Sequence, residues 1–166
     1  MELTDAVALV TGGSEGIGRA IAATLSQQGC RVTITGRRED TLRHTAEELG
    51  LDWITGDVGN EEDAIRTVNS VIEKNGRLDI LVNNAGYGIF NSLVEMTLEE
   101  FEGVYRTNVF GAFLMAREAA RHFIERGGGE LINISSTSSL KGSGGRTAYS
   151  SSKFALRGMT ECWRDE

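Results

Sequence analysis

Short apolar runs rich in β-branched residues alternate with longer segments of helical period along the chain. Strands are expected at residues 6–10, 31–35, 51–55, 80–83 and 131–134. Helices are expected at residues 16–28, 39–49 and 61–74, from Thr97 to about Glu125, and from Ala148 to the last residue. Strands that alternate with helices form βαβ crossovers, which make the strands parallel and place helices on both faces of the sheet. The sequence therefore predicts one doubly wound α/β domain over residues 1–166.

Composition narrows the class of protein. A chain of 166 residues can bury one hydrophobic core. Its 17 basic and 24 acidic residues give a net charge of −7, so its overall field does not attract nucleic acid or an anionic membrane. The apolar runs are too short to cross a bilayer, and residues 1–5 lack the pattern of a secretory leader. Two cysteines do not make a disulfide framework. We therefore expect a cytoplasmic protein that binds neither nucleic acid nor membrane.

A glycine-rich turn follows the first expected strand and opens the first expected helix. Such glycines let the backbone turn tightly and approach a pyrophosphate, and the helix N-terminus offers free N–H groups and a positive dipole. The spacing is one residue longer than in the Rossmann pattern G-x-G-x-x-G. A plain strand–helix turn is the alternative. The context favours a Rossmann-type dinucleotide site formed by Gly12, Ser14, Glu15, Gly16, Ile17 and Gly18.

The end of the second strand bears on the choice of coenzyme. An acid there binds the ribose 2′-hydroxyl of NAD, whereas an arginine accommodates the 2′-phosphate of NADP. This chain has Arg37 and Arg38 and no acid at that position. Arginine suits a phosphate because its planar fork can bind two oxygens. Glu15 opposes this assignment by adding negative charge near the phosphates, and a solvent-exposed arginine pair is the alternative. The sequence favours NADP over NAD.

Tyr149 and Lys153 lie one helical turn apart, so both side chains fall on the same helix face. The lysine ammonium favours the phenolate form of the tyrosine, which suits a group that moves a proton at neutral pH. Ser136 precedes the tyrosine by thirteen residues, in a cluster of serines that makes its assignment ambiguous. A tyrosine that only packs the helix is the alternative. No cluster of cysteine and histidine indicates a metal site.

Together these motifs resemble the short-chain dehydrogenase/reductase family. Residues 11–18 match the family's coenzyme turn, and residues 83–86 match its N-N-A-G sequence, which places Asn84, Ala85 and Gly86 at the coenzyme. Asp57 and Val58 match the pair at the adenine pocket. Asn108 falls where the family has its catalytic asparagine, and Ser136, Tyr149 and Lys153 match the catalytic serine and Y-x-x-x-K.

The resemblance also implies a role for each matched residue. Tyr149 would be the general acid in reduction and the base in oxidation, and Lys153 would also bond the nicotinamide ribose. Ser136 would bond the substrate oxygen where negative charge develops. Asn108 would hold, through its backbone, a water that relays protons to the lysine. The Asp57 side chain would bond the adenine amine.

The resemblance also implies a strand order of 3-2-1-4-5 and assembly into a homodimer or homotetramer in the full-length form. Family members continue past the Tyr149 helix with a substrate loop and two more strands, which this chain lacks. We therefore expect a C-terminally incomplete part of a longer enzyme, although a naturally short chain is the alternative. The implied function is an NADP-dependent reductase of a ketone, similar to 3-oxoacyl-(acyl carrier protein) reductases. The alternatives are a sugar, steroid or small xenobiotic carbonyl as substrate, or a nucleotide-binding fragment without turnover.

Overall fold

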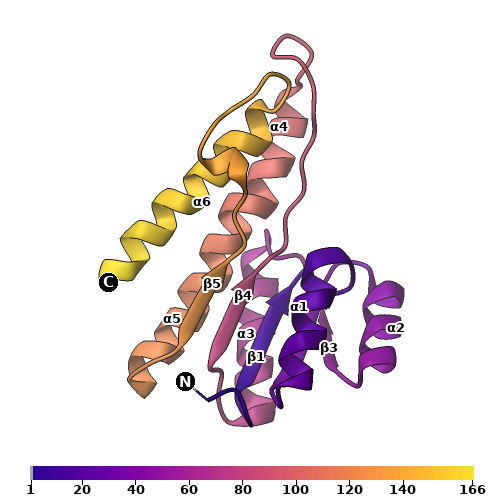
Figure 1. Cartoon of the computed structure of the whole chain (residues 1–166), viewed down its shortest axis with the longest axis vertical. Coiled ribbons are helices and arrows are strands. Elements are labelled where there is room, and N and C mark those ends of the chain that lie inside the picture. The colour runs from indigo at the N-terminus through magenta and orange to yellow at the C-terminus, as the bar shows by residue number, and fades with distance from the viewer. Residues whose placement is uncertain (1) are drawn as a thin grey trace.

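Five parallel strands form a single sheet in the order β3-β2-β1-β4-β5 (Figure 1). The structure is a computed structural model that describes residues 2–166. The strands are β1 (Val7–Thr11), β2 (Arg31–Gly36), β3 (Asp52–Thr55), β4 (Ile80–Asn83) and β5 (Glu130–Asn133). The expected doubly wound sheet and its order are confirmed, and each strand lies within one residue of its expected bounds.

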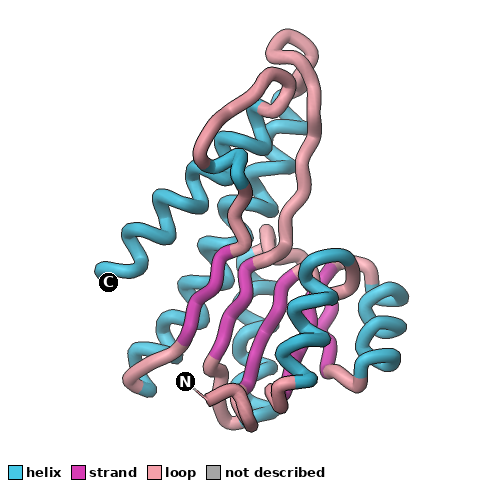
Figure 2. Tube along the Cα trace, in the orientation of Figure 1, coloured by secondary structure: helices cyan, strands magenta, loops and turns pink. Residues whose placement is uncertain are grey.

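The helices account for most of the remaining chain (Figure 2). They are α1 (Gly16–Gln27), α2 (Glu39–Leu49), α3 (Glu61–Asn75), α4 (Leu98–Tyr105), the π-helical η1 (Arg106–Gly111), α5 (Ala112–Arg126), the 3₁₀ turn η2 (Thr137–Ser139) and α6 (Thr147–Asp165). Among residues 2–166, none of these helices is both long and apolar enough to cross a membrane.

Alternate residues of the central strands β1 and β4 fill two cores, one on each face of the sheet. On β1, Ala8 and Val10 pack with α1 and α2, whereas Val7 and Leu9 pack with α3 and α5. Figure 1 shows α1 in front of the sheet and α3 and α5 behind it. Since both faces are covered, the central strands are apolar at nearly every position.

The segment expected to be one long helix contains a π-helical turn. Its start is as expected, because Thr97 and Glu100 form a capping box: Thr97 Oγ1 accepts from Glu100 N–H, and Glu100 Oε2 accepts from Thr97 N–H. The chain then passes through α4, η1 and α5, with Asn108 inside the π turn. One added residue shifts the phase of the hydrophobic pattern only once, and α4 before the turn is too short for the sequence to reveal that shift.

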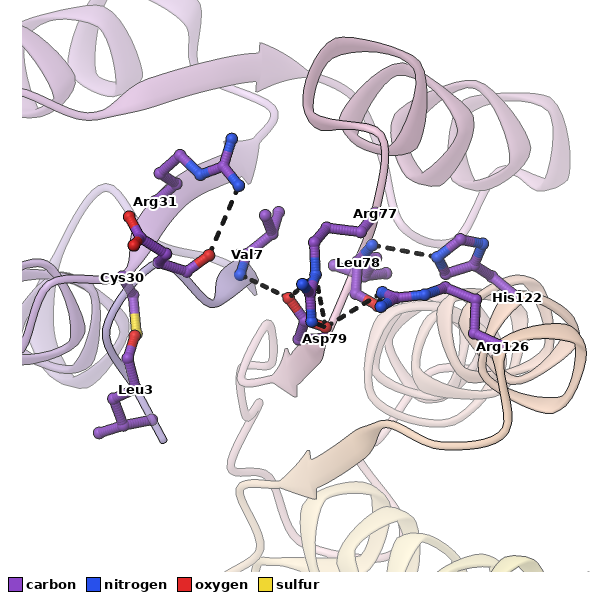
Figure 3. Close-up of polar contacts among 10 residues, drawn as sticks. Leu3, Val7, Cys30, Arg31, Arg77, Leu78, Asp79, His122 and Arg126 are labelled. Carbon is purple, nitrogen blue, oxygen red and sulfur yellow. Dashed lines mark hydrogen bonds and ion pairs between the residues drawn. The ribbon is translucent and has the colours of Figure 1, made fainter. Parts of the chain in front are cut away.

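A buried aspartate ties β1, β4 and α5 together at the amino ends of the strands (Figure 3). Asp79 accepts the Val7 N–H at 2.8 Å and hydrogen bonds from the guanidinium groups of Arg77 and Arg126. Its side chain is 6% exposed. Beside it, His122 Nε2 accepts the Leu78 N–H at 3.1 Å. This polar cluster lies at the edge of the sheet opposite to the cavity described next.

Candidate active site

The glycine-rich turn connects β1 to α1 at the carboxyl edge of the sheet. Gly12 has φ +62°, a left-handed conformation that glycine adopts without strain. A Cβ on Gly18 would overlap with Gly12 O and Asn84 Nδ2, so the helix can approach the strand this closely only with glycine there. No side chain caps α1, and its first N–H groups are therefore free for an anion.

The turn is held by residues from the other half of the sheet. Thr11 Oγ1 accepts N–H groups from Asn84 at 3.0 Å and from Ala85 at 2.9 Å. Asn84 Nδ2 donates in turn to Thr11 O and Gly12 O. Asn84, the second asparagine of the N-N-A-G sequence, thus fixes the conformation of the glycine-rich turn through these hydrogen bonds.

A cavity of about 570 Å³ lies along this carboxyl edge. One end is lined by the glycine-rich turn and the end of β2, and the other end by α6 and the segment after β4. The lining residues are Gly12, Ser14, Glu15, Gly16, Ile17, Gly36, Arg37, Arg38, Gly56, Asp57, Val58, Asn84, Ala85, Gly86, Tyr87, Thr107, Ile134, Ser135, Tyr149 and Lys153. Most of the residues expected at the coenzyme and two of the expected catalytic residues therefore share one cavity.

The two arginines after β2 have different surroundings. Arg38 pairs with Glu15 at 2.6 Å, so the acid that would oppose a phosphate is neutralised by the second arginine. Arg37 is exposed, lines the cavity and has no ion-pair partner among residues 2–166. Arg37 is therefore the arginine available to an anionic ligand at this end.

Asp57 and Val58 follow β3 and form the wall next to Arg37. Asp57 Oδ1 accepts the Gly59 N–H at 2.9 Å, which leaves Oδ2 free to accept from a ligand. Val58 is buried and packs in the core behind the sheet. A Cβ on Gly111 would lie 2.5 Å from Val58 Cγ2, so η1 packs directly against this valine.

Tyr149 and Lys153 form the far end of the cavity. Lys153 Nζ lies 5.9 Å from the centroid of the Tyr149 ring and donates to Ile134 O at 2.8 Å. Lys153 is 6% exposed, and this burial lowers the pKa of its ammonium below the ordinary value. The rings of Phe90 and Tyr149 pack in a T-shaped arrangement, with centroids 5.8 Å apart and an interplanar angle of 73°. The tyrosine ring thus has both an ammonium and an aromatic ring as neighbours.

Ser136 and Asn108 lie beside the cavity without lining it. Ser136 Oγ accepts the Ser138 N–H at 3.1 Å, which leaves the Ser136 hydroxyl proton free to donate. Asn108 is 1% exposed; its Oδ1 accepts the Tyr87 N–H at 3.0 Å and its Nδ2 donates to Tyr87 O at 2.9 Å. Asn108 therefore fixes the segment after β4 and is not a solvent-facing residue.

The profile of the short chain dehydrogenase family matches residues 6–166. This chain belongs to that oxidoreductase family. An uncharacterized oxidoreductase of Bacillus subtilis is 37% identical over 171 aligned positions, which cover 99% of this chain and 48% of the relative. A 3-oxoacyl-[acyl-carrier-protein] reductase of Bos taurus is 36% identical over 164 positions, covering 98% of this chain and 69% of the relative.

The fold is also that of solved family members. The structure of a short-chain type dehydrogenase/reductase from Mycobacterium ulcerans matches with a TM-score of 0.96 at 29% identity. The match covers 99% of this chain and 63% of the other. The chain therefore spans from about half to about two thirds of the length of these relatives.

Thr107, Ile134 and Ser135 are among the lining residues of this short-chain dehydrogenase that were not expected from sequence. Each is next to a recognised position, since Thr107 precedes Asn108, Ser135 precedes Ser136, and Ile134 ends the expected fifth strand. Ile134 contributes through its carbonyl, which accepts from Lys153. A backbone acceptor leaves no trace in residue type, so only its position after the strand could have indicated it.

Proposed function

We propose that this chain carries the coenzyme and proton-transfer sites of an NADP-dependent oxidoreductase that interconverts a ketone and a secondary alcohol. The observation that carries this proposal is the single cavity with Arg37 at one end and the Tyr149–Lys153 pair at the other. A 3-oxoacyl thioester is the substrate we favour, because one relative is named as a 3-oxoacyl-[acyl-carrier-protein] reductase. A sugar, steroid or xenobiotic ketone is the competing substrate class.

The residues of the cavity fit a dinucleotide. The free N–H groups at the start of α1 suit the pyrophosphate, and the Gly12–Gly18 contact lets the backbone approach it closely. Asp57 Oδ2 is free to accept from the adenine amine. Arg37 would bind the 2′-phosphate, and Lys153 the nicotinamide ribose. The bound nicotinamide supplies hydride transfer to or from the substrate carbon.

The protein's own contribution is positioning and proton transfer. In reduction, the Tyr149 hydroxyl gives its proton to the carbonyl oxygen as the carbonyl carbon gains hydride, and the product is an alcohol. The Ser136 hydroxyl donates a hydrogen bond to the same oxygen without giving up its proton, and so stabilises the negative charge that develops there. The Lys153 ammonium, with its Nζ 5.9 Å from the centroid of the Tyr149 ring, places a positive charge next to the group that transfers the proton.

The role of Tyr149 predicts a defined loss of turnover. Tyr149→Phe keeps the ring packing on Phe90 and removes the proton, so ketone reduction with NADPH should fall by about 10² to 10⁴-fold. NADPH binding, measured by fluorescence, should change little because the phosphate-binding residues lie on other elements. Retained turnover in Tyr149→Phe would show that another group supplies the proton.

The role of Arg37 predicts a change in coenzyme preference. Arg37→Ala should weaken NADPH binding by about 1.5–3 kcal/mol, the cost of a charge-assisted hydrogen bond, and leave NADH binding nearly unchanged. Both dissociation constants can be measured by fluorescence titration. Arg43→Ala is the matched control, because Arg43 lies outside the cavity and pairs with Asp40 on α2. An equal loss for NADH and NADPH would contradict the assignment to NADP.

Assembly and location complete the proposal. Phe110, Phe113 and Phe154 expose their rings on η1, α5 and α6, which supports a homodimer or homotetramer through these elements. The free cysteines Cys30 and Cys162 agree with a reducing compartment, and the cytoplasm is the location we propose.

A further inference from the structure

A buried hydroxyl connects Asn108 to the helix that carries Tyr149 and Lys153. Besides its two bonds to Tyr87, the Asn108 amide donates from Nδ2 to Ser152 Oγ at 3.0 Å. Ser152 Oγ then donates to Tyr149 O at 2.7 Å. Ser152 has no exposed surface, and Asn108 has almost none. A polar bridge without competing water thus runs from the segment after β4, through the π turn, to α6.

The bridge lies against the same wall as the lysine ammonium. A Cβ on Gly86 would lie 3.0 Å from Asn108 Oδ1 and 3.7 Å from Lys153 Nζ. Ser152 is also the residue next to Lys153 in the chain. A shift of α6 relative to Asn108 would therefore move the ammonium relative to Gly86 and to Ile134 O, its hydrogen-bond acceptor.

Ser151, the residue before Ser152, is a useful comparison because its hydroxyl forms hydrogen bonds only within α6. Ser151 Oγ donates to Thr147 O at 2.6 Å, and both residues belong to α6. Ser152 also donates to a carbonyl of α6, but it alone of the two accepts a hydrogen bond from a different element. The two serines therefore differ in the one contact that can fix the helix in place.

We propose that Ser152 is a positioning residue, whose hydroxyl fixes α6 to the Asn108 amide and so sets where Tyr149 and Lys153 lie at the cavity. This inference rests on the proposed roles of Tyr149 and Lys153. The groups proposed to bind the coenzyme phosphates and adenine lie on the turns after β1, β2 and β3, away from the bridge. Loss of the hydroxyl should therefore reduce kcat while the contacts to the coenzyme phosphates and adenine stay intact, so coenzyme binding loses at most the ribose contact of Lys153.

The position of Lys153 can be measured without turnover. The chain has three lysines, Lys74, Lys141 and Lys153, so ¹³C-labelled lysine side chains give few signals to assign by NMR. In Ser152→Ala, the pH midpoint of the Lys153 signal should rise by about half a unit or more, because the ammonium becomes better hydrated. Ser151→Ala should leave it where it is in the wild type. An unchanged Lys153 midpoint in Ser152→Ala, or an equal rise in both variants, overturns the proposal.

A double-mutant cycle tests whether the two halves of the bridge act together. Asn108→Ala should shift the Lys153 midpoint in the same direction, and the double variant should shift it by less than the sum of the two. Additive shifts would mean that Ser152 and Asn108 act separately, and would overturn the bridge. Near-ultraviolet circular dichroism of each variant shows whether the fold is retained, and Asn108→Ala carries the same prediction if Ser152→Ala does not fold.

Turnover separates this proposal from the proposed function. With NADPH and a 3-oxoacyl thioester, Ser152→Ala should lower kcat by about tenfold or more and raise the coenzyme KM by a smaller factor, because only the ribose contact of Lys153 is disturbed. Equal kcat values for Ser152→Ala and Ser151→Ala would overturn the positioning role. If the wild-type protein reduces no ketone, the proposed function fails, while the lysine titration still decides whether Ser152 positions Lys153.

Discussion

Lys153 is a buried cation with a single hydrogen-bond acceptor among the described residues, Ile134 O. An ammonium has three donors, and burial removes the water that would satisfy the other two. This loss of hydration lowers the pKa of Lys153, because it disfavours the charged form. We therefore expect Lys153 to contribute to the proposed proton transfer while lowering the free energy of unfolding.

Replacing this lysine should separate stability from activity. Its folded-state pKa lies below the unfolded value, so burying the ammonium costs stability at neutral pH, and this cost falls as pH rises through the folded pKa. Lys153→Met should raise the free energy of unfolding at neutral pH by about 1–2 kcal/mol, with a smaller gain at alkaline pH, and abolish turnover. Urea denaturation at the two pH values measures this.

The exposed Lys141 provides the control for that variant. Lys141→Met should change the free energy of unfolding by less than about 0.5 kcal/mol at either pH. If Lys153→Met is less stable than the wild type at neutral pH, the hydrogen bond to Ile134 O outweighs the cost of burial.

For individual residues, the sequence predicted which side chains lie at the candidate coenzyme site, but it did not predict which of them form ion pairs with one another. It placed Glu15, Arg37 and Arg38 near one another, yet only the structure distinguishes the paired Arg38 from Arg37. The Glu15–Arg38 contact joins residues 23 positions apart through side-chain rotamers that no local pattern specifies. The bridge through Ser152 was not expected, because a serine inside a helix is more often bonded to its own helix.

At the scale of elements, Asp79 joins three segments of the chain at one carboxylate. Burial alone would raise its pKa, but hydrogen bonds from Arg77, the Val7 N–H and Arg126 outweigh that effect and lower it. The unfolded state then binds protons more readily than the folded state. The contribution of Asp79 to stability is therefore complete above the unfolded pKa, about 3.9, and is lost as pH falls through the folded pKa.

The variant Asp79→Asn tests how much the hydrogen bonds and ion pairs of Asp79 contribute to the free energy of unfolding. The change leaves two guanidinium groups without their anion, and the free energy of unfolding at neutral pH should fall by about 2–4 kcal/mol. Urea denaturation measures this value. Asp52→Asn is the matched control: its exposed pair with Lys74 should be worth less than about 1 kcal/mol. Equal losses in the two variants would mean that burial adds nothing to the Asp79 cluster.

The order and type of the elements were predictable because strands and helices differ in hydrophobic period, and glycines mark most of their ends. Gly50 and Gly76, for example, end α2 and α3 in the left-handed conformation. The π turn was not predictable. It depends on how Asn108 and Val58 pack between α6 and the sheet, which is set by tertiary contacts and not by the local sequence.

At the scale of the whole molecule, three phenylalanines are exposed to solvent on η1, α5 and α6: Phe110 at 54%, Phe113 at 42% and Phe154 at 45%. Aromatic side chains are enriched where proteins associate. The proposed assembly predicts that Phe113→Asp lowers the mean mass in sedimentation equilibrium toward that of one chain. Val94→Asp, at a residue 92% exposed on the segment before α4, should leave the mass unchanged. A wild-type protein that is monomeric at high concentration would contradict this assembly.

The hydrogen bonds between Thr11 and Asn84 also have a consequence for the order of folding. They join residues more than seventy positions apart, so the glycine-rich turn reaches its final shape only after β4 has paired with β1. Contacts between distant residues form late because the long intervening loop must close first. During synthesis, a nascent chain that ends before Asn84 would have the glycines of the turn but not the groups that hold them. The ability to bind a dinucleotide should therefore arise late and in one step, when the two halves of the sheet meet.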